Sequence, residues 1–304
     1  MPKADGTWHE TVLQVGSPIP LQGVRTVPAV TAMADAALII LNSGLLHHVG
    51  SCCLSVQVAR AAADIGVMAV RYDASGIGDS AARPSPLPQD ARAVAELGEV
   101  VEALAQRHGV RRVALLGLCS GAFTAFEGAQ NDARIVGITQ IAPFAYRTHE
   151  WYARHYGARV LSSEKWRSFI RRKMGVAAPR PRGLSPEYLE SYDAGWSVPS
   201  PEHLEAGYKR LVERGVHLLN IMTGGEAESY NYEGQFRDMF PNLDLGTRFT
   251  EWYLPDATHT ITDPSHQRLV QQRVTQWLAT VMAPAAAPGA SPGTAQALAA
   301  AVLA

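Results

Sequence analysis

The chain has 304 residues, of which 47% are hydrophobic and 18% are charged, so it can bury the core of one large globular domain. Its 27 basic and 28 acidic residues nearly cancel, which argues against a surface built as a whole for nucleic acid or for an anionic membrane. The three cysteines, Cys52, Cys53 and Cys119, are too few for a secreted disulfide scaffold.

The chain lacks the long apolar segments that mark membrane proteins. No window holds roughly 18 uninterrupted apolar residues, and residues 1–10 carry charges where a signal sequence has an apolar run. We therefore expect a soluble cytoplasmic protein with no membrane span and no nucleic-acid partner.

Short apolar runs alternate with segments of helical spacing along most of the chain. The runs end at polar or glycine residues, as strands buried on both faces do. The predicted strands lie at residues 36–42, 66–72, 111–117, 135–142, 216–223 and 248–254. The predicted helices lie at residues 52–64 and 90–108, from about residue 122, and at residues 265–282. This alternation predicts βαβ units and an α/β fold with a parallel sheet.

Two regions depart from this pattern. Residues 146–205 are rich in Trp, Tyr and Arg, and they predict an inserted lid over a core made of residues 1–145 and 206–282. Residues 146–182 hold ten basic and two acidic residues, which can bind an anionic substrate or simply keep a lid soluble. Residues 283–304 are uncharged and rich in Ala, Pro and Gly, which predicts a flexible tail.

A glycine-bracketed cysteine follows one of the predicted strands. The segment Gly117–Gly121 reads Gly-Leu-Cys-Ser-Gly and precedes a predicted helix, which is the setting of a nucleophile elbow. Such a turn exposes its central side chain and needs small residues two positions before and after it. Centring the turn on Ser120 would place Leu118 and Ala122 at those crowded positions. The pattern therefore predicts Cys119 as the nucleophile, with an ordinary glycine turn as the alternative reading.

A histidine and an acid follow in the order that nucleophilic catalysis requires. His259 lies between the last predicted strand and the last predicted helix, where a general base belongs. An acid is expected on the loop after the strand that ends near residue 222. Glu228 is preferred because it stands three residues beyond Gly225. Glu226 is the close alternative and Asp256 a weaker one, and a solvated loop carboxylate is the other reading of either glutamate.

Two backbone N–H groups are expected to bind the oxyanion of an acyl-transfer reaction. One belongs to Ser120, directly after the candidate nucleophile. The other is expected from Leu45, in the Asn-Ser-Gly-Leu loop that follows the first predicted strand, although a simple turn is equally typical there. Close behind this loop, His47 and His48 either line the pocket or lie on the surface.

These features resemble the α/β-hydrolase superfamily from about residue 10 to 282. The segment 42–80 is similar to bacterial hydrolases of the serine-aminopeptidase type, and the cysteine elbow is similar to that of dienelactone hydrolases. The resemblance implies an α/β-hydrolase fold with an inserted helical lid, and it makes Asp73 part of a structural turn. Two departures are a Cys in place of the usual Ser and a Glu in place of the usual Asp.

The predicted function is that of a hydrolase acting on an ester or thioester through a Cys119–His259–Glu228 triad. A thiolate is both a strong nucleophile and a good leaving group, so it favours activated acyl donors, including carrier-linked or coenzyme A-linked thioesters. An acyltransferase, a carrier-editing thioesterase or a non-catalytic protein that binds a small ligand are the alternatives. The histidines and cysteines lack metal-ligand spacing, so neither metal nor cofactor is expected. The oligomeric state, a homodimer included, is left open.

Overall fold

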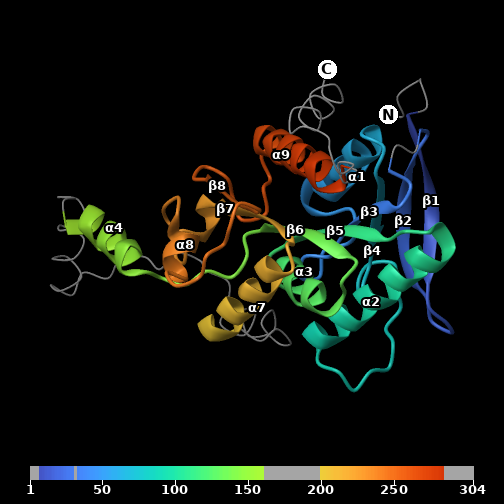
Figure 1. Ribbon diagram of the computed structural model, residues 1–304, viewed down its shortest axis with the longest axis horizontal. Coiled ribbons are helices and arrows are strands. Elements are labelled where there is room, and N and C mark those ends of the chain that lie inside the picture. The colour runs from blue at the N-terminus through green and yellow to red at the C-terminus, as the bar shows by residue number, and fades with distance from the viewer. Residues whose placement is uncertain (1–6, 31–32, 161–198, 284–304) are drawn as a thin grey trace, which may run out of the picture.

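The computed structural model describes residues 7–30, 33–160 and 199–283, and these residues form one eight-stranded sheet (Figure 1). The strand order across the sheet is β1-β2-β4-β3-β5-β6-β7-β8. The strands are β1 (Trp8–Val15), β2 (Leu21–Pro28), β3 (Ala36–Ile40), β4 (Met68–Tyr72), β5 (Arg112–Leu118), β6 (Ile135–Ile141), β7 (His217–Thr223) and β8 (Phe249–Leu254). The six strands predicted from the sequence are confirmed.

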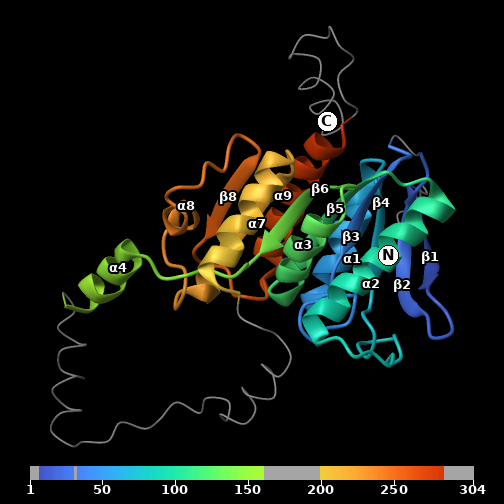
Figure 2. The ribbon, with the colours of Figure 1, turned by 60° about the horizontal axis from the view of Figure 1, so that its bottom comes forward.

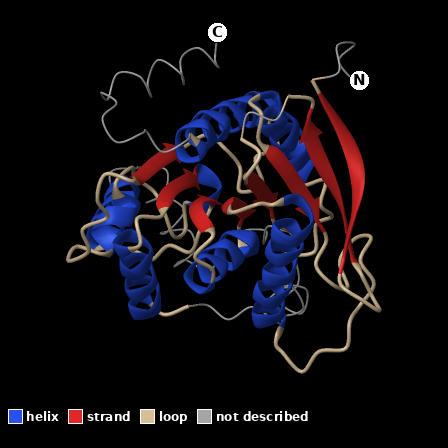
Figure 3. Cartoon of the chain, turned by 45° about the vertical axis from the view of Figure 1, so that its right-hand side comes forward, coloured by secondary structure: helices blue, strands red, loops and turns tan. Residues whose placement is uncertain are grey.

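The sheet is parallel from β4 through β3 and β5 to β8. The strands β1 and β2 form an antiparallel hairpin that joins β4 in antiparallel register, at one edge of the sheet (Figure 3). This hairpin was not predicted, because β1 exposes much of its length and carries no continuous apolar run. The parallel strands all end on one edge, where the loops with the candidate site residues gather.

Helices cover both faces of the sheet. The helices α1 (Leu54–Asp64) and α9 (Pro264–Met282) pack together on one face, while α2 (Gln89–His108), α3 (Ser120–Asn131) and α7 (Pro201–Glu213) lie on the other (Figures 1 and 2). Two buried clusters of apolar side chains, one on each face, hold these layers to the sheet. This is the α/β-hydrolase fold expected from the sequence.

The expected lid is described only at its two ends. The helix α4 (His149–Val160) projects beyond the β8 end of the sheet, near the short helix α8 (Gln235–Met239) (Figure 2). The helix α7 begins inside the range expected for the lid and packs on α3. The rest of the expected lid and nearly all of the expected tail lie outside the described residues. Among the described helices, none combines the length and apolar character needed to cross a membrane.

Candidate active site

Cys119 lies at the turn between β5 and α3, in a backbone conformation that side-chain-bearing residues rarely adopt. Its φ is 55° and its ψ is −118°. The turn needs glycine on both sides, because a Cβ on Gly117 would collide with the carbonyl of Gly121 and one on Gly121 would collide with that of Asn42. The backbone turn expected at this position is therefore present, and strain of this kind is typical of functional sites.

His259 lies on the loop after β8 and stands between two other site residues. Its Nδ1 forms a close hydrogen bond with the carboxylate of Glu226. Hydrogen bonding to Cys119, and then to Glu226, raises the pKa of the His259 imidazole to about 10, against the opposing effect of burial. A charged imidazolium is thus favoured between the sulfur and the carboxylate.

The carboxylate beside His259 belongs to Glu226, and not to Glu228, which the sequence favoured. A Cβ on Gly225 would collide with the backbone nitrogen of His259, so the two loops touch at this glycine. The residue directly after Gly225 therefore reaches the imidazole. Glu228, two residues further on, is exposed, as is Asp256. The offset of three residues assumed a longer turn than the one-turn 3₁₀ helix that forms here, η2 (Gly224–Glu226).

The start of α4 packs against this acidic loop. Trp151 is buried and its Nε1 donates to the carbonyl oxygen of Ala227 at 3.2 Å. The Arg147 side chain lies over the Trp151 ring and donates through Nε to the carbonyl oxygen of Glu228 at 2.7 Å. Much of the basic segment, with Trp166 and residues 171–173, lies outside the described residues, so its role in anion binding stays a prediction.

The loop after β3 lies beside the turn at Cys119. The N–H of Gly44 donates to Ser120 Oγ at 2.7 Å, and the N–H of Leu46 donates to the Ser43 carbonyl at 3.0 Å. Leu45 stands between them, and its N–H has no hydrogen-bond partner among the described residues. Ser120 is the first residue of α3, so its N–H has no intrahelical acceptor. Both N–H groups that the sequence assigned to an oxyanion are thus free to donate.

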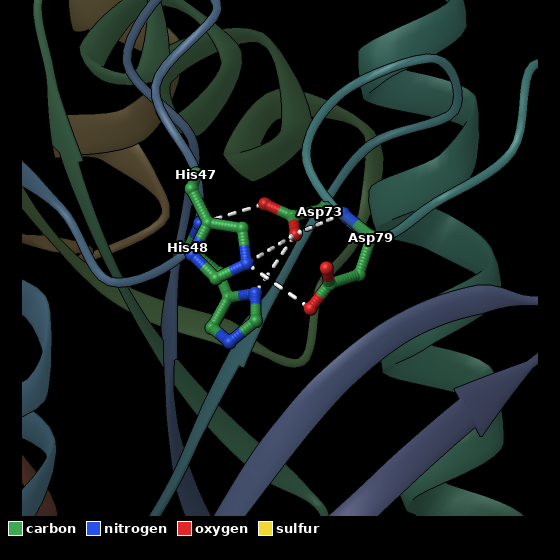
Figure 4. A group of neighbouring side chains, drawn as sticks. All are labelled: His47, His48, Asp73 and Asp79. Atoms are coloured by element: carbon green, nitrogen blue, oxygen red, sulfur yellow. Dashed lines mark hydrogen bonds and ion pairs between the residues drawn. The ribbon is translucent and has the colours of Figure 1, made fainter.

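Asp73, directly after β4, is a fully buried carboxylate that ties this loop to the next one (Figure 4). Its Oδ1 accepts hydrogen bonds from Asn42 Nδ2 at 2.8 Å and from the His48 N–H at 2.7 Å. Its Oδ2 accepts from His48 Nδ1 at 2.8 Å and from the Asp79 N–H at 3.0 Å. Burial works to raise the pKa of the Asp73 carboxyl, but the hydrogen bonds hold it below its ordinary value. The buried carboxylate is therefore charged, and hydrogen bonds from the protein take the place of water around it.

His47 completes a cluster in which one ligand-type atom from each of His47, His48, Asp73 and Asp79 lies within 4.8 Å of the others (Figure 4). Its Nε2 is 3.1 Å from Asp79 Oδ2 and 3.4 Å from Asp73 Oδ2. Its Nδ1 accepts a hydrogen bond from the Val49 N–H at 3.3 Å, which assigns the ring hydrogen to Nε2. With that tautomer Nε2 is a donor to the carboxylates and not a metal ligand. The four residues fit a hydrogen-bond network better than a metal centre.

Comparison with known proteins identifies the family. Residues 34–208, more than half of the chain, match the model of the family described as serine aminopeptidase, S33. The chain belongs to this family of α/β hydrolases. This serine aminopeptidase S33 family member is therefore an α/β-hydrolase enzyme, although a cysteine occupies its elbow.

Solved structures share the fold of this S33 family member at low sequence identity. A proline iminopeptidase from Mycobacterium smegmatis matches with a TM-score of 0.57 and 17% identity, covering 90% of this chain and 99% of its own. The Pyrococcus furiosus esterase Pf2001 matches with a TM-score of 0.60 and 14% identity, covering 90% and 91%. An α/β serine hydrolase without a lid, from Xanthomonas campestris, matches with a TM-score of 0.53 and 15% identity, covering 92% and 97%. Among curated proteins, none matches the chain.

In the sequence of this S33 family member, Asn42 was predicted only as part of the Asn-Ser-Gly-Leu loop, and Asp73 only as part of a turn. Asp73 directly follows β4, and Asn42 follows β3 after one intervening residue. The two strands are parallel neighbours, so polar side chains at their adjacent ends meet in space. That juxtaposition was a usable signal. The histidines of the cluster gave no comparable signal, because His48 lies 25 residues from Asp73 along the chain.

Proposed function

We propose that this enzyme cleaves an ester or thioester through an acyl-enzyme on Cys119, with His259 as acid and base and Glu226 orienting His259. The observation that carries the proposal is the place of His259, which hydrogen-bonds the Glu226 carboxylate through Nδ1 and has its pKa raised chiefly by Cys119. A thiolate beside an imidazolium is a nucleophile that needs no proton transfer at the moment of attack.

In the first half-reaction the Cys119 thiolate attacks the acyl carbonyl and forms a carbon–sulfur bond. The carbonyl oxygen becomes an oxyanion, which accepts hydrogen bonds from the N–H groups of Leu45 and Ser120. Collapse of this intermediate breaks the bond to the alcohol or thiol, and the His259 imidazolium gives that leaving group its proton. The acyl group remains on the sulfur and the imidazole is neutral.

In the second half-reaction neutral His259 takes a proton from water as the water oxygen attacks the thioester carbonyl. The same two N–H groups receive the second oxyanion. Collapse expels the Cys119 thiolate and releases the free acid, which restores the thiolate and the imidazolium. The Glu226 carboxylate keeps the ring orientation and stabilises its charged form in both halves.

We expect an activated acyl donor, because a thiolate is expelled more readily than an alkoxide or an amine. Thioesters and aryl or enol esters meet this condition. The basic residues between 146 and 182 support an anionic donor, such as an acyl group on coenzyme A or on the phosphopantetheine of a carrier. Transfer of the acyl group to an amine, alcohol or thiol in place of water uses the same acyl-enzyme.

Intact-protein mass spectrometry after brief exposure to acyl thioesters and aryl esters tests the proposal. We expect a mass gain that maps to Cys119 in the parent protein, is slower in His259→Ala and is absent in Cys119→Ala. Products analysed with and without an amine acceptor separate hydrolysis, which yields only free acid, from acyl transfer. Turnover by Cys119→Ala at the parental rate would overturn the assignment of the nucleophile.

A further inference from the structure

The oxyanion loop, defined as residues 42–48, is fixed at alternating points along its length. Its first residue is held through the Asn42 side chain, which donates to Asp73 Oδ1 and to the Leu46 carbonyl, each at 2.8 Å. Its middle is held by the Gly44 N–H on Ser120 Oγ. Its last residue, His48, is held at two atoms, the backbone N–H and ring Nδ1, which both contact Asp73. Leu45 stands between the fixed points and is 69% exposed.

Two of these attachments end on one carboxylate. Asp73 receives the Asn42 amide at the start of the loop and both the backbone and the ring N–H of His48 at its end. The Asn42 Oδ1 in turn accepts from the Ala74 N–H at 2.8 Å, which adds a bond in the reverse direction. The loop is thus clamped to β4 from both ends by a charge that is itself 0% exposed.

We propose that Asp73 and His48 are positioning residues, which hold the oxyanion loop so that the free Leu45 N–H points at the reacting carbonyl. The inference rests on the proposed function, because it assigns a task to residues around that same site. The hydrogen bonds described for Asp73 and for the His48 ring all run to groups of the protein. They act through the backbone of the loop, and an oxyanion donor must be in place before charge develops on the oxygen.

A charged clamp holds firmly because a buried carboxylate that loses a hydrogen-bond donor is strongly destabilised. Loss of the His48 ring removes one donor from a buried carboxylate, and the remaining charge attracts water or rearranges the loop to recover a partner. A displacement of the loop moves the Leu45 N–H, while the Ser120 N–H stays fixed by α3. One of two oxyanion donors is therefore lost and the nucleophile is left unchanged.

The rim of the cluster provides the control. Asp79 contacts Asp73 through its backbone N–H, and its side chain is 66% exposed. Asp79→Asn keeps that N–H and keeps a side-chain oxygen that can accept from His47 Nε2, so it leaves the clamp intact. His48→Ala removes the ring donor and keeps the backbone N–H, whereas His48→Asn returns a side-chain N–H donor near the position of Nδ1.

The experiment compares two reactions of the same sulfur. Acylation by an aryl thioester passes through an oxyanion, whereas alkylation by iodoacetamide forms a carbon–sulfur bond and expels iodide without one. Both rates are followed by intact mass for the parent and for each variant. We expect His48→Ala to slow acylation roughly 10- to 100-fold, a part of the full effect of an oxyanion donor, and to change alkylation by less than about twofold.

His48→Asn is expected to recover most of the acylation rate, and Asp79→Asn to match the parent. Asp73→Asn places an amide N–H against donors and is expected to lose at least as much as His48→Ala; the His48 variants decide the matter if Asp73→Asn does not fold. Equal acylation rates in parent and His48→Ala, or equal losses in acylation and alkylation, would overturn the inference. A parent that is alkylated and never acylated contradicts the proposed function itself, and so the two failures differ.

Discussion

The two sides of Cys119 are held by different means. On the oxyanion side, the Asp73 and His48 side chains are 0% and 6% exposed and no proton needs to leave them. On the acid–base side, the His259 and Glu226 side chains are 34% and 25% exposed, and backbone contact at Gly225 brings their loops together. The difference fits the task that we propose for each side. Groups that only hold a donor in place are best buried and fixed, while a group that exchanges protons with solvent keeps access to it.

Replacing Cys119 is the largest expected change, because in the proposed mechanism both sides act through its sulfur. We expect Cys119→Ala to lower turnover by about 10³-fold or more. Because φ is positive at this position, Cys119→Gly should be more stable than Cys119→Ala by about 1 kcal/mol, the reverse of their order in a helix. Initial rates and urea unfolding check the two effects. Equal stability of the two variants would contradict the strained turn.

A matched pair of glutamates tests the acid–base side. We expect Glu226→Gln to lower turnover roughly 10- to 1,000-fold, since it removes the charge that orients and stabilises the imidazolium. Turnover by Glu228→Gln should stay within about twofold of the parent, because that side chain is exposed and the carboxylate beside His259 is that of Glu226. Steady-state rates of the two variants under one condition are sufficient. The opposite ranking would return the role of the acid to Glu228.

The pH dependence should report the acid–base side alone. The pKa of His259 is raised from its ordinary value near 6.5 to about 10, so the imidazolium persists through neutral pH and is lost as pH rises through about 10. Acylation should therefore fall on the alkaline side, and Glu226→Gln should move that fall to lower pH. His48→Ala should reduce the acylation rate without changing the pH at which the rate falls. A shift with His48→Ala would contradict the separation of the two sides.

The smallest expected effect concerns the Ser120 hydroxyl. Ser120→Ala keeps the N–H that we propose binds the oxyanion and removes the acceptor for the Gly44 N–H. We expect acylation to slow by about fivefold, the value of one ordinary hydrogen bond, with alkylation unchanged. Ser43→Ala is the matched control, because Ser43 holds Leu46 through its carbonyl. Equal rates for both variants would mean that the loop is fixed without Ser120.

The parallel sheet could be predicted because buried parallel strands are continuous apolar runs, as in residues 36–42. The hairpin β1–β2 could not, because an edge strand that is half exposed has no such run. The turn at Cys119 was predictable from its glycines. The choice between Glu226 and Glu228 depended on a contact of two backbones at Gly225, which spacing along the chain does not encode.

The clamp at Asp73 couples the loops after β3 and β4, so in protein engineering they behave as one structural unit. Residues 42–48 and 73–79 come from different strands, yet their hydrogen bonds end on a single carboxylate. A chimera that receives residues 42–48 from another hydrolase and keeps residues 73–79 would retain the buried Asp73 carboxylate without the donors that match it. Grafts in this region should therefore exchange both segments together.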